Sequence, residues 1–201
     1  MNLKNWWYQV ENAIPHRICD DIVAFGNQQA DEIALIGGLE KTPEKKKDLS
    51  KLWKTRNSSV IWMQEPWIWL AIEPYVKEAN EKAGWNFDLV DAENFQFTKY
   101  SKSQHYSWHQ DAFPTPDKNG LVRKISLTLA LADGDSYEGG DFEFDLRNNL
   151  KTNKSNIKKC PVARKKGTLI LFPSFVWHRV TPVTSGTRYS LVIWSRGLPF
   201  R

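Results

Sequence analysis

The sequence contains few cysteines and no long apolar run. Only Cys19 and Cys160 occur among its 201 residues, too few for a disulfide framework and without the paired spacing of a zinc ribbon. No stretch approaches the ~18 uninterrupted apolar residues of a transmembrane helix, and the first residues lack the apolar core and cleavage site of a secretory signal. We therefore expect a cytoplasmic protein in a reducing compartment, with no membrane partner.

The composition is that of an ordinary globular protein. Hydrophobic residues make up 41% of the chain and charged residues 25%. The net charge of +5 allows an acidic partner such as nucleic acid, but it is also common on plain soluble surfaces. Ten tryptophans are unusual, and such side chains either fill a core or line a substrate groove. The length suits a single domain over residues 1–201.

The N-terminal third reads as mainly helical. Apolar residues recur at helical spacing in 15–31, and again from Trp67 through Leu70, Ala71 and Tyr75 to Ala79. The sequence SSVIWM at 58–63 predicts a strand, and the charged run at 41–51 predicts an exposed loop. We expect residues 1–92 to support the rest of the chain.

From residue 93 onward the pattern changes to short strands separated by Gly, Pro and Asn clusters. Strands of this number and length indicate a jelly-roll or barrel, with the N-terminal helices packed on one sheet. The predicted strands are 94–100, 105–110, 123–131, 141–145, 158–163, 168–172, 176–181 and 187–195.

Three residues could hold a metal ion. In a strand, His109 and Asp111 of the sequence His-Gln-Asp share one face, and His178 lies in a second predicted strand. Two imidazoles and one carboxylate leave coordination positions open, which suits non-haem Fe(II) oxygen chemistry rather than a closed structural zinc site. Since His-x-Asp arises easily by chance, the surrounding sequence has to support this interpretation.

Arg188 provides that support. Pro182 and Ser185-Gly186 predict a turn that returns the chain as a hairpin, so that 178 and 188 lie on neighbouring strands. Arg188, Ser190, Val192 and Trp194 then share one face of the last strand. An inward arginine needs an anion, which a metal-chelating dicarboxylate would supply, with Ser190 adding a hydrogen bond. The alternative is a surface arginine on an edge strand.

Three sequence blocks resemble the PKHD-type hydroxylases, relatives of prolyl 4-hydroxylases among the Fe(II)/2-oxoglutarate dioxygenases. The blocks are YSKSQHYSWHQD, ISLTLALADGDSYEGGDFEF and GTLILFPSFVWHRVTPVTSGTRYSLVIW, spread over about 93–197 in the family's order. The resemblance implies a double-stranded β-helix fold and a defined set of site residues. These are His109, Asp111 and His178 as iron ligands, Arg188 with Tyr100 and Ser190 for 2-oxoglutarate, and Arg123 for substrate.

Two departures from the family's pattern stand out. Ser103 occupies a position where the family usually has glycine, and 112–122 differs from the usual segment after the His-x-Asp motif. The loops at 101–108 and 112–122 flank the first two ligands and are the expected lid. Tyr106, Trp108 and Trp194 either line the substrate pocket or pack as ordinary core residues.

The resemblance implies hydroxylation of a C–H bond with O2 and 2-oxoglutarate as co-substrates and release of succinate and CO2. It implies Fe(II) as cofactor, ascorbate as a candidate reductant, and a peptidyl proline or other protein residue as the favoured substrate. An extended proline-containing segment would suit an aromatic groove. His105 and His16 are expected to be surface or packing residues, because no His-Glu-x-x-His motif supports a zinc hydrolase.

Two alternatives stay open. The first is an oxygenase that demethylates alkylated nucleic-acid bases, and the second is a jelly-roll binding module without catalysis. A basic loop over 151–166 supports the first alternative, although such a loop is more often merely solvated. Its cations are Lys151, Lys154, Lys158, Lys159, Arg164, Lys165 and Lys166.

Overall fold

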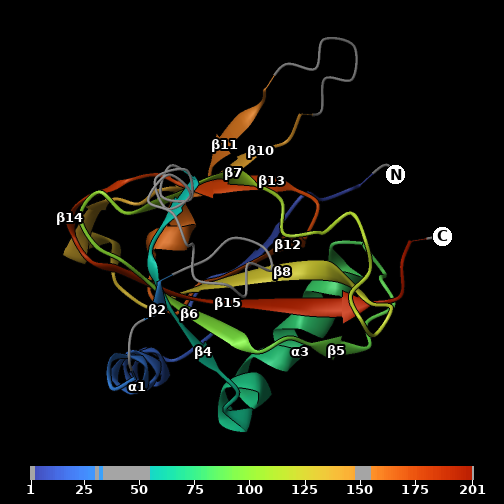
Figure 1. Ribbon diagram of the computed structural model, residues 1–201, viewed down its shortest axis with the longest axis horizontal. Coiled ribbons are helices and arrows are strands. Elements are labelled where there is room, and N and C mark those ends of the chain that lie inside the picture. Colours follow the sequence, from blue (N-terminus) through green and yellow to red (C-terminus); the bar gives the residue numbers. More distant parts are fainter. Residues whose placement is uncertain (1–2, 30–31, 34–54, 148–154, 201) are drawn as a thin grey trace, which may run out of the picture.

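The computed structural model describes residues 3–29, 32–33, 55–147 and 155–200, and antiparallel sheets are the main regular structure among them (Figure 1). The helices are α1 (His16–Asn27) and α3 (Pro66–Lys82), with short 3-10 turns at Gly134–Ser136 and Pro161–Arg164. In chain order the strands are β1 (Tyr8–Val10), β2 (Glu32–Ile33), β3 (Arg56–Asn57), β4 (Ser59–Met63), β5 (Asp91–Ala92), β6 (Phe95–Tyr100), β7 (His105–His109), β8 (Val122–Ala130), β9 (Tyr137–Gly139), β10 (Phe142–Asp145), β11 (Ile157–Lys159), β12 (Leu169–Pro173), β13 (Trp177–Val180), β14 (Val183–Gly186) and β15 (Arg188–Gly197).

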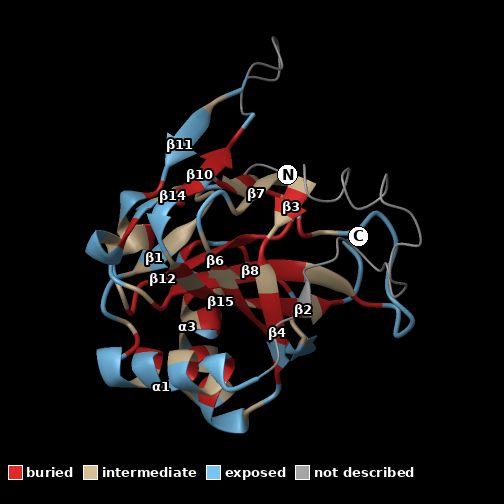
Figure 2. Cartoon of the chain, turned by 60° about the vertical axis from the view of Figure 1, so that its left-hand side comes forward, coloured by how far each residue is buried: buried red, intermediate tan, exposed pale blue. Residues whose placement is uncertain are grey.

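The larger sheet has the strand order β1-β12-β8-β15-β6-β4-β2, with β5 added beside β15. Its central strands are buried on both faces, since the helices cover one face and the smaller sheet covers the other. This explains why β12 reads as a continuous apolar run instead of an alternating one. The sheet therefore forms the middle layer of the molecule (Figure 2).

The smaller sheet has the order β11-β10-β13-β7-β3, and a two-stranded ribbon of β14 and β9 lies beside it. Its inner side chains include Phe142, Phe144 and Val180, which pack against Phe172 of the larger sheet in a shared apolar cluster. The expected jelly-roll core is confirmed by these two facing antiparallel sheets.

The helices α1 and α3 pack on the outer face of the larger sheet (Figure 1). Gly26 of α1 lies directly against Phe97 of β6, because a Cβ atom at this position would be 2.7 Å from the ring. The helix predicted after residue 65 is present, but its buried face differs from the predicted one: Ile68, Ile72 and Val76 are buried, while Leu70 is exposed. No helix in the described ranges is long and apolar enough to cross a membrane.

The predicted strands are largely confirmed, with two differences. The strand predicted at 158–163 ends at Lys159, and Pro161 begins a 3-10 turn there instead. The N-terminal third also contributes strands that local patterns did not reveal, since β1 pairs with β12 and β3 pairs with β7. The single-domain organisation over 1–201 stays a prediction, and the charged run at 41–51 lies outside the described residues.

Candidate active site

A small cavity of about 30 Å³ lies between the two sheets. Both sheets supply polar side chains and aromatic rings to the wall. The lining residues are Gln96, Tyr100, Tyr106, His109, Asp111, Leu127, Thr128, Phe142, Phe172, His178, Val180, Arg188, Ser190, Val192 and Trp194.

His109, Asp111 and His178 meet at one end of this cavity. One carboxylate oxygen of Asp111 lies 3.5 Å from Nε2 of His109, and the other lies 3.5 Å from Nε2 of His178. The candidate ligand atoms of all three residues fall within 4.8 Å of one another. Two nitrogen donors and one carboxylate arranged in this way fit a metal ion that keeps open coordination positions.

Backbone carbonyls orient both imidazole rings. Nδ1 of His109 lies 2.8 Å from the carbonyl oxygen of Ser107, and Nδ1 of His178 lies 3.0 Å from that of Val176. A proton on Nδ1 is donated to each carbonyl, so Nε2 keeps its lone pair for a metal. The two rings are therefore held in the tautomer that a ligand requires.

The segment 173–176 holds Asp111 in place. The carbonyl oxygen of Ser174 accepts hydrogen bonds from the backbone N–H groups of Asp111 and Ala112, at 2.9 and 3.0 Å. Asp111 lies beyond the end of β7, so this carbonyl, and not strand alternation, sets its position. The prediction that His109 and Asp111 share a strand face is wrong, although the two side chains do meet.

Burial and charge set the protonation of this cluster. Burial raises the pKa of Asp111, but the nearby His178, His109 and Arg123 outweigh it and leave that pKa well below its usual value. Burial, followed by the charge of His109, lowers the pKa of His178 to about 4. The cluster thus offers an ionised carboxylate and a neutral His178 at neutral pH, as metal binding requires.

A β-bulge turns Tyr106 toward the metal cluster. The pairing of β7 with β13 shifts between His178↔His109 and Val180↔Tyr106, which places one extra residue in β7. As a result, Tyr106 and His109 stack with ring centroids 3.5 Å apart, although strict alternation would put them on opposite faces. Trp108, for which the sequence left both pocket lining and ordinary packing open, is not part of the wall, and its ring contacts Arg179.

Arg188 lies at the opposite wall of the cavity and is only 3% exposed. Its Nη1 donates to Oγ of Ser190 at 3.0 Å, and its guanidinium lies 5.4 Å from the ring centroid of Tyr100, its cross-strand partner. Among the residues that the structure describes, none forms an ion pair with Arg188. Burying a guanidinium without a carboxylate partner costs free energy. We therefore expect Arg188 to bind an anionic ligand at this wall.

The predicted hairpin between 178 and 188 is wrong. His178 belongs to the smaller sheet and Arg188 to the larger one, and β14 connects them by pairing with β9. The two residues consequently face each other across the cavity instead of lying side by side. The predicted inward face of β15 is confirmed, because Ser190, Val192 and Trp194 line the cavity with Arg188.

Arg123, expected to contact substrate, is already engaged within the protein. Its guanidinium forms a two-fold ion pair with Glu93, at 2.7 and 2.6 Å, and stacks 3.8 Å from the ring centroid of Trp194. Arg123 is not part of the cavity wall. A direct contact between Arg123 and substrate stays a prediction. In the structure Arg123 reaches the cavity only indirectly, because it stacks on Trp194, which lines the wall.

The two expected lid segments differ in structure. Only 101–104 is a loop, because β7 begins at His105, and Ser103 has the left-handed φ of 69° that usually favours glycine. This conformation explains the glycine expected at position 103 from the resemblance. The segment 112–121 is a loop whose exposed Phe113 contacts Arg123. Lid closure itself stays a prediction.

The sequence prediction missed several residues around the cavity. Arg56 is buried, with its guanidinium 4.6 Å from the ring centroid of Tyr106, and its Nη2 has no hydrogen-bond partner among the described residues. Gln96 and Thr128 add polar groups to the wall. The period-two pattern of β6 and β8 could have indicated the last two, whereas Arg56 depends on the non-local pairing of β3 with β7.

Curated relatives match half of the chain or slightly more. A PKHD-type hydroxylase of Teredinibacter turnerae is 36% identical over 105 residues, 51% of this chain and 42% of the relative. A PKHD-type hydroxylase of Synechococcus sp. is 33% identical over 132 residues, 62% of this chain and 54% of the relative. The chain thus spans about half the length of the curated relatives it matches.

Solved structures resemble nearly the whole fold. A Pseudomonas putida prolyl-4-hydroxylase has a TM-score of 0.68 at 19% identity, over 96% of this chain and 93% of that one. A Trichoplax adhaerens prolyl hydroxylase, in complex with a hypoxia inducible factor peptide fragment, has a TM-score of 0.65 at 13% identity, over 95% and 83%. These likenesses support the jelly-roll fold.

The family of oxygenases that use Fe(II) and 2-oxoglutarate matches residues 95–196, which contain the histidines, the aspartate and the unpaired arginine of the cavity. Two histidine nitrogens and an aspartate carboxylate are ligands that suit Fe(II). The guanidinium of Arg188 suits a carboxylate group of 2-oxoglutarate. This chain belongs to the 2OG-Fe(II) oxygenase superfamily.

Proposed function

We propose that this protein is an Fe(II)- and 2-oxoglutarate-dependent dioxygenase that hydroxylates a C–H bond of a protein residue, with a peptidyl proline as the preferred target. One observation carries the proposal: Arg188, buried and without an ion-pair partner among the described residues, shares a cavity with the His109, Asp111 and His178 cluster. A cation at one wall and a metal-ligand set at the other match a co-substrate with a carboxylate at each end.

Each residue has a distinct proposed role. His109, Asp111 and His178 hold Fe(II), and Arg188 binds the distal carboxylate of 2-oxoglutarate, with Ser190 fixing the guanidinium. Tyr100 lies beside that carboxylate position. When bound, Fe(II) and 2-oxoglutarate supply the oxidising chemistry, in which O2 is consumed, succinate and CO2 are released and a hydroxyl group is added to the substrate. The surrounding rings of Phe142 and Phe172 exclude water from His178.

The relatives support a protein substrate. The structurally similar Trichoplax adhaerens protein is a prolyl hydroxylase in complex with a peptide, and the sequence relatives are named as hydroxylases. The aromatic rings in the cavity wall, among them Tyr106 and Trp194, suit an apolar residue better than a charged one. We therefore favour a peptide over a free polar metabolite.

The nucleic-acid alternative has less support. Of the basic loop, Lys151 and Lys154 lie outside the described residues, while Lys159 pairs with Asp141 and Lys165 with Glu11. Arg164 donates to the backbone carbonyls of Gly139, Gly134 and Tyr137, and Lys166 pairs with Asp20. Lys158 is exposed and forms no ion pair with a described residue, so it is the one cation of this group that the described contacts leave available for phosphate.

An anaerobic titration of the purified chain tests the proposal. Adding Fe(II) and 2-oxoglutarate should produce a metal-to-ligand absorption band, and admitting O2 should convert 2-oxoglutarate to succinate. His109→Ala should abolish both signals, whereas His16→Ala, at an exposed histidine outside the cavity, should leave both unchanged. A protein that gives neither band nor succinate would favour the non-catalytic binding module.

The substrate class has its own readout. Candidate proteins incubated with the enzyme, Fe(II), 2-oxoglutarate and O2 should gain the mass of one oxygen atom on a residue that fragmentation locates. Oxygen on a proline supports the preferred target. Loss of a methyl group from an alkylated oligonucleotide, with no oxidised peptide, would overturn it.

A further inference from the structure

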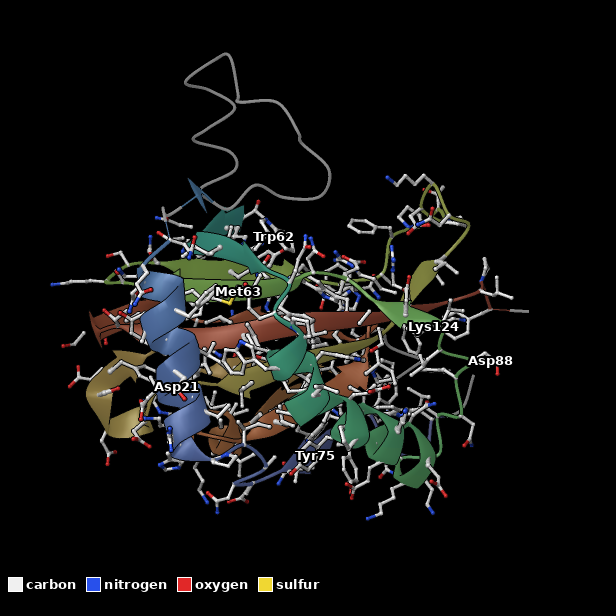
Figure 3. The ribbon with its side chains drawn as sticks, turned by 90° about the horizontal axis from the view of Figure 1, so that it is seen from below. Asp21, Trp62, Met63, Tyr75, Asp88 and Lys124 are labelled. Atoms are coloured by element: carbon white, nitrogen blue, oxygen red, sulfur yellow. The ribbon has the colours of Figure 1, made fainter. Side chains whose placement is uncertain are left out.

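A β-bulge in β8 places a lysine behind the cavity wall. The pairing of β15 with β8 shifts between Ser195 and Arg196, which leaves Lys124 without a partner on β15. Lys124 is not part of the cavity wall, and its side chain lies on the side of the larger sheet where Asp88 is found (Figure 3). Only 4% of Lys124 is exposed, so its ammonium group has to be stabilised within the protein.

The ring of Phe200, in the segment that follows β15, covers this lysine. Nζ of Lys124 lies 3.3 Å from the ring centroid of Phe200 and 5.9 Å from that of Phe87. The two rings pack edge to face, with their centroids 5.2 Å apart. The face of an aromatic ring attracts a cation, and the attraction grows where water is excluded. Although Phe200 is 44% exposed, its ring therefore stabilises a buried charge.

Lys124 and Phe200 both contact the turn at 173–176. The backbone N–H of Ser174 donates a hydrogen bond to the carbonyl oxygen of Lys124 at 2.9 Å. The ring of Phe200 packs edge to face against Phe175, with the two centroids 5.9 Å apart. The position of this turn therefore depends on both residues.

The same turn holds the segment that carries a metal ligand. The carbonyl oxygen of Ser174 accepts from the backbone N–H of Asp111 at 2.9 Å, and that of Phe175 accepts from the side-chain amide of Gln110. Asp111 lies beyond the end of β7, so the pairing of β7 with β13 does not fix it. A continuous series of contacts thus leads from Phe200 to Asp111.

We propose that Phe200 is a positioning residue for the metal site. By covering Lys124 and packing on Phe175, it keeps the turn at 173–176 in the place from which Ser174 sets Asp111. Without this ring, water reaches the ammonium group of Lys124, and the lysine and the turn shift together. The inference rests on the proposed function in one respect, because it takes Asp111 as a metal ligand.

Titration of the metal-free protein with Mn(II) under nitrogen tests this role. Phe200→Ala should weaken Mn(II) binding about fivefold, less than the ~10–100-fold typical of groups that contact a ligand directly. Phe200→Tyr keeps the ring and should stay within about twofold of the parent. In a protein that already carries Lys124→Met, Phe200→Ala should weaken binding less than about twofold, because no charge is left for water to reach.

Two controls separate positioning from general stability. Leu198 is 50% exposed in the same segment, so Leu198→Ala should leave Mn(II) affinity within about twofold of the parent. Ile22→Val, in the buried face of α1, should lower the melting temperature but leave Mn(II) affinity unchanged. The visible absorption spectrum of bound Co(II) reports ligand geometry, and it should change in Phe200→Ala but not in Ile22→Val.

Four results would overturn the positioning role. They are an unchanged Mn(II) affinity in Phe200→Ala, an equal loss of affinity in either control, an unaltered Co(II) spectrum in Phe200→Ala, and a fivefold effect of Phe200→Ala that persists beside Lys124→Met. A loss in Phe200→Tyr as large as that in Phe200→Ala would also contradict it, because the tyrosine keeps the ring.

Succinate formation from 2-oxoglutarate distinguishes the two proposals. If the parent forms succinate but Phe200→Ala binds Mn(II) as tightly as the parent, the positioning role fails and the proposed function stands. If the parent forms no succinate but Phe200→Ala lowers Mn(II) affinity, the oxygenase proposal fails while the positioning role stands.

Discussion

The two walls of the cavity are built in different ways. The larger sheet places Arg188, Ser190 and Trp194 by regular alternation along β15. The smaller sheet places its residues by departures from regularity, because the bulge in β7 redirects Tyr106 and a backbone carbonyl of Ser174 holds Asp111. A regular strand is enough to place Arg188 and Ser190 on one wall. A metal site instead needs three ligand atoms that converge from different directions.

This difference implies that the two walls can be disabled separately. Changes on β15 should weaken the co-substrate and leave metal affinity intact, and changes in the ligand cluster should do the reverse. The most informative variants are therefore those that separate the two affinities.

The largest effect is expected at the metal wall. His178→Ala removes one of three ligands and should lower the affinity for Mn(II) or Fe(II) at least 100-fold, more than the ~10–100-fold typical of changes behind the ligands. Isothermal titration with Mn(II) under nitrogen measures this affinity. His105→Ala, at a half-exposed histidine outside the cavity wall, is the control and should change it less than about twofold.

A somewhat smaller effect is expected at the opposite wall. Arg188→Met should raise the 2-oxoglutarate concentration for half-maximal succinate formation roughly 100-fold, because the distal carboxylate loses a buried charged donor worth ~2–5 kcal/mol. Ser190→Ala should raise it about fivefold. Metal affinity should stay within about twofold in both variants, and a parallel loss of metal affinity would contradict the separation of the walls.

Acid should destabilise the metal-free protein through the smaller sheet. His178 has its pKa lowered from 6.5 to about 4, first by burial and then by His109. The unfolded chain therefore takes up a proton below about pH 6.5 while the folded chain resists it, so stability is full above 6.5 and falls as the pH drops toward 4. Urea unfolding between about pH 7 and 4.5 measures the loss, and His178→Gln should make the profile flatter.

The smallest effect concerns the two thiols, one in the helix layer and one in the cluster between the sheets. Burial raises the pKa of Cys19, in the helix layer, and of Cys160, in the smaller-sheet cluster, to about 11. Both should react slowly with a thiol reagent at neutral pH. Because the smaller sheet is the less regular one, Cys160 should react severalfold faster than Cys19. Mass spectrometry of partially labelled protein gives the order, and the reverse order would show that the helix layer opens first.

The sequence predicted what depends on local alternation. The strands, the inward face of β15 and the involvement of His109, Asp111, His178 and Arg188 in one cavity all follow from residue type and spacing, aided by a family resemblance. Such patterns carry the information because side chains alternate strictly along a regular strand.

What the sequence did not predict depends on non-local backbone contacts. No local pattern shows that β14 pairs with β9 and so separates His178 from Arg188, or that an extra residue in β7 turns Tyr106 inward. The buried face of α3 was also misjudged, because Trp67 and Leu70 are as apolar as Ile68 and Ile72, and only the sheet beneath the helix distinguishes them.

Ser174 forms hydrogen bonds on two sides. Its carbonyl oxygen accepts from the backbone N–H groups of Asp111 and Ala112, and its hydroxyl oxygen accepts from the hydroxyl of Ser126 on the larger sheet at 3.0 Å. The aspartate is thereby anchored to both halves of the sandwich. A metal ligand held in this way should keep its position when either sheet shifts alone.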